Sequence, residues 1–231
     1  MNPRDPNVAL VETVARALGP LNERVVFVGG CAVGLLITDD ARPIVRATQD
    51  VDIIAEIATR AAYYELADEL RRVGFIEDKN ANVICRWRLG KLQVDVMPTE
   101  EAVFGFSNRW SLAALRAAQN VTLPTGSAIR LIAPPYLVAT KLEAFYDRGN
   151  GDYGASHDIE DIVNLVDGRL ELVDEIRNSD ANLREYLSEE VDGLLGEGHF
   201  VDTLSWHLGP SEIEQARVEN VIERLRRIAG T

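Results

Sequence analysis

The sequence predicts an α+β fold, in which a mixed-sheet α/β domain over residues 1–133 is followed by a helical domain over residues 134–231. Up to residue 133, short β-branched and apolar runs alternate with segments of helical periodicity, and glycine, proline and polar residues separate them. After Pro134-Pro135 the periodicity is almost wholly helical. The chain of 231 residues is long enough for one large domain or two small ones, with a core above the marginal size.

Periodicity and turn residues give the expected elements. Apolar residues at helical spacing predict a helix over Pro6–Leu18, and Thr59 is the expected N-cap of a helix that runs to about Val73. Gly90-Lys91, between two strand-like runs, predicts a two-residue hairpin. The other expected elements of the first domain are a helix over residues 31–37, a polar loop over residues 38–47, and strands over residues 24–28, 50–57, 83–89, 92–97, 121–123 and 128–132. In the second domain, helices are expected over residues 135–147, 157–166, 170–177, 182–195 and 210–229.

Composition and charge restrict the class of protein. The sequence carries 24 Lys and Arg against 37 Asp and Glu, a formal net charge of −13. We therefore expect no strong non-specific binding of DNA or RNA, although a local basic groove or a basic protein partner is compatible with this charge. No apolar run approaches the roughly 20 residues that a membrane helix needs, and the N-terminus lacks the layout of a signal peptide. Cys31 and Cys85 are too few for a disulfide framework, so we expect a cytoplasmic protein in which both are small buried residues.

Three aspartates in strand-like runs are the candidate metal ligands. Asp50 and Asp52 are two positions apart, so on a strand they point to the same face. Asp95, in a later strand, can reach the same point. Three convergent carboxylates form a site for a hard divalent cation such as Mg²⁺, whose charge compensates their repulsion. The alternative is a set of surface-facing acids on half-buried strands.

A turn and its neighbours are candidates for phosphate binding. Gly29-Gly30 lies between an expected strand and an expected helix, where bare backbone N–H groups can face a phosphate. The alternative is that these glycines only allow tight packing. Arg46 and Thr48, just before the Asp50 strand, could add phosphate contacts or could be polar residues at a strand edge.

These motifs together resemble the nucleotidyltransferase superfamily typified by DNA polymerase β. Its pattern is a Gly-Gly or Gly-Ser turn, an Asp-x-Asp pair and a third acid on a later strand, which match Val28-Gly29-Gly30, Asp50-Val51-Asp52 and Val94-Asp95-Val96. The spacing from the turn to the pair is similar to that of the tRNA-end-adding enzymes and the AbiEii-like toxins. The resemblance implies a nucleotidyltransferase domain over residues 1–133, with Mg²⁺ or Mn²⁺ as cofactor and an NTP as substrate. Gly30 stands where many relatives have serine, so a hydroxyl contact to phosphate is lost.

Four residues of the helical domain narrow the resemblance. Lys141, Arg148, Asp158 and Asp161 resemble the Lys-x-x-Ala…Arg…Asp-x-x-Asp signature of AbiEii-like nucleotidyltransferases. In that family Lys141 would contact the nucleotide phosphates, and Asp158 or Asp161 would complete the active site. Lys141 and Arg148 are about two helical turns apart, so both can line one helix face and bind the nucleotide. A compact ammonium charge suits a phosphate. The alternative is a helix–helix salt-bridge network of the same four residues.

The expected activity is transfer of an NMP from an NTP to an acceptor, with release of pyrophosphate. The resemblance implies a toxin of a toxin–antitoxin or phage-defence pair, with the tRNA 3′ end as one acceptor and an antitoxin protein as a partner. Two alternatives stay open. One is a nucleotidyltransferase of small molecules, because a cationic aminoglycoside would suit an acidic protein. The other is a catalytically degenerate protein that binds a nucleotide or docks a partner.

Overall fold

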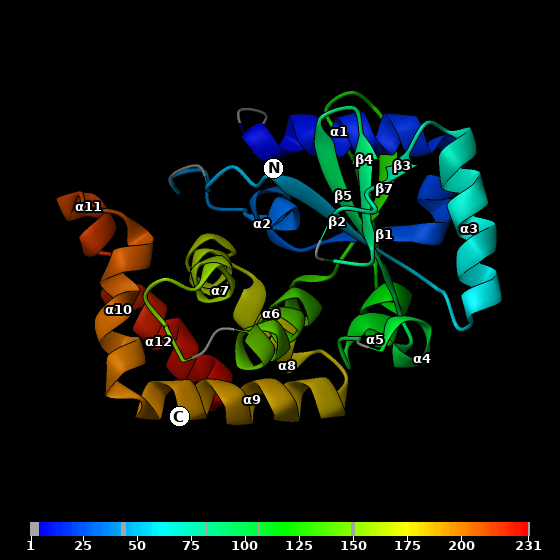
Figure 1. The fold of residues 1–231 in the computed structure, drawn as a ribbon. Coiled ribbons are helices and arrows are strands. Elements are labelled where there is room, and N and C mark those ends of the chain that lie inside the picture. The colour runs from blue at the N-terminus through cyan, green and yellow to red at the C-terminus, as the bar shows by residue number, and fades with distance from the viewer. Residues whose placement is uncertain (1–4, 43–44, 82, 106, 149–150, 231) are drawn as a thin grey trace. The chain divides into compact units, whose positions relative to one another are not determined.

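The computed structural model describes residues 5–42, 45–81, 83–105, 107–148 and 151–230 (Figure 1). The fold is α+β, as predicted, and its strands form one mixed sheet. It divides into two compact units. The sheet unit takes the described residues of Asn2–Leu35 and Ile44–Ala133, and the helical unit takes those of Leu36–Pro43 and Pro134–Thr231.

The sequence did not indicate that residues 36–42, called here the crossing segment, belong to the helical unit. Residues 38–42 of this segment fall in the loop predicted over residues 38–47, and residues 36–37 fall at the end of the helix predicted over residues 31–37. Residues 43–44 of the predicted loop lie outside the described part of the chain.

The sheet has the strand order β3-β4-β5-β2-β1-β7-β6 within the described residues. β2 pairs in parallel with β5 and β1 pairs in parallel with β7, whereas the other neighbours are antiparallel. The inner strands are rich in buried valine and isoleucine, as β-branched residues favour strands that are covered on both faces. The strands are β1 Val25–Val28, β2 Asp50–Ala55, β3 Ile76–Glu77, β4 Arg86–Leu89, β5 Leu92–Pro98, β6 Gln119–Thr122 and β7 Ala128–Leu131.

Two helices of the sheet unit, α1 and α3, begin at residues whose side chains cap them. Asp5 caps α1 by accepting a hydrogen bond of 2.8 Å from the backbone N–H of Asn7. Thr59 caps α3, as predicted, by accepting a hydrogen bond of 3.1 Å from the backbone N–H of Ala62. α1 packs against β2, and α3 packs against β3. The helices are α1 Pro6–Leu18, the 3₁₀ helix η1 Gly19–Arg24, α2 Gly30–Leu36, α3 Arg60–Arg72, α4 Glu101–Phe104 and α5 Ser111–Arg116.

The core of the helical unit lies between α6, α7, α9 and α12, which pack on one another (Figure 1). Leucines on these helices, such as Leu142, Leu165 and Leu187, are fully buried. Among the helices of the described residues, none combines the length and the apolar character that a membrane span needs. The helices are α6 Pro134–Arg148, α7 His157–Gly168, α8 Leu172–Arg177, α9 Ala181–Gly196, α10 Gly198–Leu208, α11 Glu212–Gln215 and α12 Val218–Ala229.

The crossing segment is tied to the C-terminal end of α7. The backbone N–H groups of Thr38 and Asp39 both donate to the carbonyl oxygen of Gly168, at 3.0 and 2.9 Å. Arg217 also links the crossing segment to α7, because it lies 2.5 Å from Asp39 of the segment and 2.8 Å from Asp167 of the helix. Asp167 is only 2% exposed, so its charge needs such partners. The crossing segment is thus held by backbone and side-chain bonds of the helical unit.

The C-terminal helices differ from their prediction. The helix predicted over residues 210–229 is two helices, α11 and α12. Ser211 and Glu214 form a capping box that begins α11, and Ala216 and Arg217 form a turn that separates α11 from α12, although both keep right-handed helical dihedral angles. The break carries neither glycine nor proline, so the helical periodicity concealed it. α10 was not predicted at all.

Two helical glycines should respond oppositely to alanine. A Cβ at Gly34 of α2 would lie 2.6 Å from Cγ of Asp5 and 3.0 Å from Cγ2 of Val45, whereas a Cβ at Gly193 of α9 would meet nothing within 4 Å. Gly34→Ala should destabilise by about 1–3 kcal/mol through overpacking. Gly193→Ala should stabilise by about 0.5–1 kcal/mol, because alanine lowers the entropy of the unfolded chain. Denaturant midpoints of the two variants measure both effects, and equal shifts would contradict the packing at Gly34.

Candidate metal centre

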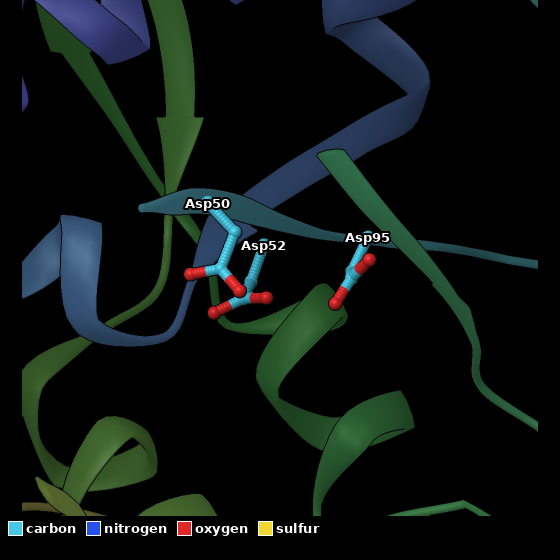
Figure 2. Close-up of side chains that lie close together, drawn as sticks. All are labelled: Asp50, Asp52 and Asp95. Carbon is cyan, nitrogen blue, oxygen red and sulfur yellow. The ribbon is translucent and has the colours of Figure 1, made fainter. Parts of the chain in front are cut away.

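The pairing of β2 with β5 brings three aspartates to one face of the sheet. In their parallel register Asp52 lies opposite Asp95, and Asp50 lies opposite Gln93. Side chains alternate along a strand, so Asp50 and Asp52 point the same way. Figure 2 shows the three carboxylates close together, and each offers one oxygen within 4.8 Å of the others. The structure therefore brings together the three acids that the sequence spacing predicted to converge.

The strands bury the residues around these acids but leave the carboxylates partly open. Val51, Ile53 and Val94 are at most 1% exposed, so apolar packing fixes both strands. The side chain of Asp50 is 34% exposed and that of Asp95 is 11% exposed. An ion from solvent can consequently reach a site whose backbone is held rigidly.

The donor set fits a hard divalent cation. Three carboxylates so close together repel one another, and a cation shared between them removes that repulsion. Carboxylate oxygen is the ligand that Mg²⁺ and Mn²⁺ prefer in proteins. The side chains are thus chemically suited to such an ion, and its binding at Asp50, Asp52 and Asp95 stays a prediction.

Arg86 is a member of this centre that the sequence analysis missed. It lies opposite Asp95 in the antiparallel pairing of β4 with β5. Its Nε donates to Oδ1 of Asp95 at 2.8 Å, and its Nη2 donates to Oδ2 of Asp95 at 2.7 Å and to Oδ2 of Asp50 at 3.3 Å. The hydrogen bonds with Asp95 raise the pKa of Arg86 above its ordinary value. Arg86 therefore brings a positive charge into the centre.

Gly29 is required by the position of Asp52. The glycine has φ +70°, and a Cβ on it would collide with the Asp52 carboxylate, with Cγ only 2.7 Å away. Val28, the residue before it, pairs with Asp52 across β1 and β2. Gly30 then begins α2. The tight packing that the sequence analysis gave as an alternative is present, and contact of either glycine with a phosphate stays a prediction.

A buried asparagine fixes the approach of the chain to β2. Asn7 is fully buried, donates to the carbonyl oxygen of Arg46 at 3.0 Å and accepts from the backbone N–H of Thr48 at 2.9 Å. The hydroxyl of Thr48 donates in turn to the carbonyl oxygen of Asp50 at 3.0 Å. Thr48 and the backbone of Arg46 thus position the first acid, and their phosphate contacts stay predictions.

The four predicted residues of the helical domain form an ion-paired group within the helical unit. Nζ of Lys141 lies 3.0 Å from Oδ1 of Asp158 and 2.6 Å from Oδ2 of Asp161. Arg148 donates two hydrogen bonds of 3.0 Å to Asp158. Lys141, Asp158 and Asp161 are buried, whereas the side chain of Arg148 is 68% exposed. This is the salt-bridge network of the sequence analysis, and catalytic or nucleotide-binding roles for these residues stay predictions.

Fold and site together define an α+β protein with a three-carboxylate centre on a mixed sheet. A scan against models of known protein families found no match, and a search of curated proteins found none either. A proposal of function therefore depends on the geometry of the centre and on the chemistry of its side chains.

The contact between Gly29 and Asp52 can be isolated with a matched pair of variants. Gly90, in the turn between β4 and β5, has φ +60°, and a Cβ there would meet nothing within 4 Å. Gly90→Ala should cost about 1–2 kcal/mol from left-handed strain alone. Gly29→Ala should cost about 1–3 kcal/mol more, because it also displaces Asp52. Thermal unfolding and Mn²⁺ titration test this, and Mn²⁺ affinity should fall only in Gly29→Ala.

The ion pairs of Asp158 give stability a pH dependence. Burial raises the pKa of Asp158, but the hydrogen bonds from Arg148 and the charge of Lys141 outweigh it and hold the pKa below its usual value. The folded state thus binds this proton less tightly than the unfolded chain, so the stabilisation is complete above about pH 4 and is lost as pH falls through the lowered pKa.

Asp158→Asn should therefore lower the free energy of unfolding by about 1–3 kcal/mol at pH 7, and its deficit should shrink towards pH 3. Denaturant unfolding across this range is the measurement. Asp174→Asn, at a side chain that is 70% exposed, is the control and should change little. A deficit that is constant with pH would show that Asp158 stabilises by packing alone.

Proposed function

We propose that this chain is a metal-dependent nucleotidyltransferase, which transfers an NMP from an NTP to an acceptor and releases pyrophosphate. The observation that carries the proposal is the register of β2 with β5, which places one oxygen of each of Asp50, Asp52 and Asp95 within 4.8 Å of the others. The resemblance of these acids and of the Gly29-Gly30 turn to the nucleotidyltransferase pattern supports the same chemistry.

The side chains of the centre have distinct tasks in this proposal. Asp50 and Asp52 hold the cation together with the triphosphate, and Asp95 completes the ligand set or accepts the proton of the acceptor hydroxyl. A bound Mg²⁺ or Mn²⁺ neutralises phosphate charge and lowers the pKa of a hydroxyl at the site. Asn7 and Thr48 keep the backbone of Asp50 in place through two half-buried hydrogen bonds, one between Asn7 and Thr48 and one between Thr48 and Asp50. Lys141, Arg148, Asp158 and Asp161 belong to the other unit, and their proposed roles rest on the resemblance alone.

The acceptor is proposed as the tRNA 3′ end, as in the toxin family that the helical signature resembles, with an antitoxin protein as partner. The net charge of −13 favours a second candidate, a cationic small molecule of the aminoglycoside kind, because an acidic protein attracts such an acceptor and repels a polyanion. Both candidates use the same transfer chemistry at the same centre.

Transfer of label tests the proposal directly. The protein is incubated with Mg²⁺, each α-labelled NTP, and either bulk tRNA or an aminoglycoside panel. Asp50→Asn and Asp52→Asn should each lower the rate of transfer by more than about a hundredfold. Loss of a residue that only orients a metal ligand already lowers activity by about 10- to 100-fold, and loss of a ligand itself should cost more. Asp68→Asn, on the surface of α3 with a side chain 63% exposed, is the matched control and should keep its activity.

The outcomes separate the candidates. Label on tRNA supports the first acceptor, and label on a small amine or hydroxyl compound supports the second. Absence of transfer to every acceptor, together with absence of NTP binding in calorimetry, would instead indicate a degenerate binding protein. Asp50→Asn or Asp52→Asn protein that folds normally and still transfers label would contradict the assignment of the centre.

A further inference from the structure

The guanidinium of Arg86 occupies both oxygens of one candidate metal ligand. Its Nε and Nη2 reach Oδ1 and Oδ2 of Asp95 at 2.8 and 2.7 Å, the fork geometry that arginine makes with a carboxylate. The same Nη2 lies 3.3 Å from Oδ2 of Asp50. Arg86 thus bridges the acids of β2 and β5 from a third strand, β4.

This bridge compensates the centre only in part. Arg86 contributes a single positive charge, whereas Asp50, Asp52 and Asp95 together contribute three negative charges when all are ionised. The side chain of Arg86 is 20% exposed and that of Asp95 is 11% exposed, so their attraction is screened less than at the surface. The bridge therefore lowers the repulsion between the acids without cancelling their whole negative charge, so the carboxylates still attract a cation.

We propose that Arg86 is a built-in counter-ion that competes with the divalent cation for Asp95, so that metal entry displaces the guanidinium from this carboxylate. The inference rests on the metal centre of the proposed function. A cation that takes an oxygen of Asp95 meets a ligand whose charge is already paired and whose two oxygens already accept hydrogen bonds. The free energy needed to break the hydrogen bonds between Arg86 and Asp95 weakens binding of the cation, so Arg86 sets the metal affinity of the centre.

A clamp that stays in place when metal binds is the competing explanation. In that case Arg86 would only join β4 to β5 and orient Asp95, and its removal would leave metal affinity unchanged or lower it. A competing counter-ion gives the opposite sign, because its removal frees Asp95 for the cation. Metal affinity therefore distinguishes the two roles, whereas both lower the stability of the metal-free protein.

Arg88 provides the matched control. It lies two positions further along β4, on the same face of the strand, opposite Gln93 rather than an acid. It contacts Asp78 at 3.8 Å, and its side chain is 48% exposed. Arg88→Gln therefore removes the same charge from the same strand without touching the centre.

The experiment titrates full-length wild-type, Arg86→Gln and Arg88→Gln proteins with Mn²⁺ alone, followed by electron paramagnetic resonance and calorimetry without nucleotide. Arg86→Gln should bind Mn²⁺ at least about tenfold more tightly than wild type, because the cation no longer has to break charge-assisted hydrogen bonds to reach Asp95. Arg88→Gln should match wild type. The metal-free thermal midpoint of Arg86→Gln should fall, and saturating Mn²⁺ should raise it by more than it raises wild type.

Equal or weaker Mn²⁺ binding by Arg86→Gln, with wild type binding normally, overturns the inference and leaves the proposed function standing. Failure of wild type and both variants to bind Mn²⁺ overturns the metal centre itself, and the inference with it. If Arg86→Gln does not fold without metal, Arg86→Lys gives the second measurement: it keeps the charge but loses the fork, so its affinity should lie above that of wild type. Binding of Mn²⁺ by Arg86→Lys with the affinity of wild type, or more weakly, would count against competition.

Discussion

The parallel pairing of β2 with β5 is the constraint on which the candidate centre depends. This single register sets Asp52 beside Asp95 and gives Asp50 the same orientation. A shift by one residue would turn the acids of one strand to the opposite face, because side chains alternate. Buried valines on both strands and buried isoleucines on β2 oppose such a shift, since it would expose them. The apolar core thereby fixes the polar site.

Residues on other elements hold the three acids in place, both through space and hydrogen bonds and through opposite charge. Gly29 lets Asp52 lie directly against the turn, where any side chain would push the carboxylate away. Arg86 supplies positive charge from β4, and Asn7 holds the entry to β2 from α1. Three elements distant in sequence thus converge on two adjacent strands, and together they keep three acids closer than they would settle unaided.

Local signals in the sequence were enough to predict much of this architecture. The Pro6–Leu18 helix, the Thr59 cap and the convergence of the three acids were all predicted, because caps and period-two alternation act over a few residues. Arg86 could have been found as well: the two-residue turn at Gly90-Lys91 fixes a register in which the fourth residue before the turn faces Asp95. The crossing segment could not, because its partners lie more than a hundred residues away in the sequence and no local pattern encodes them.

That segment has a consequence for how the protein is made and divided. The backbone bonds from Thr38 and Asp39 to Gly168 mean that the helices after Ala133 do not form a self-contained fragment. During synthesis this stretch emerges long before its partners on α7 and must wait for them. A fragment that begins at Pro134 would lack the crossing segment. The C-terminal end of α7 would then lose the hydrogen bonds that Thr38 and Asp39 donate to Gly168.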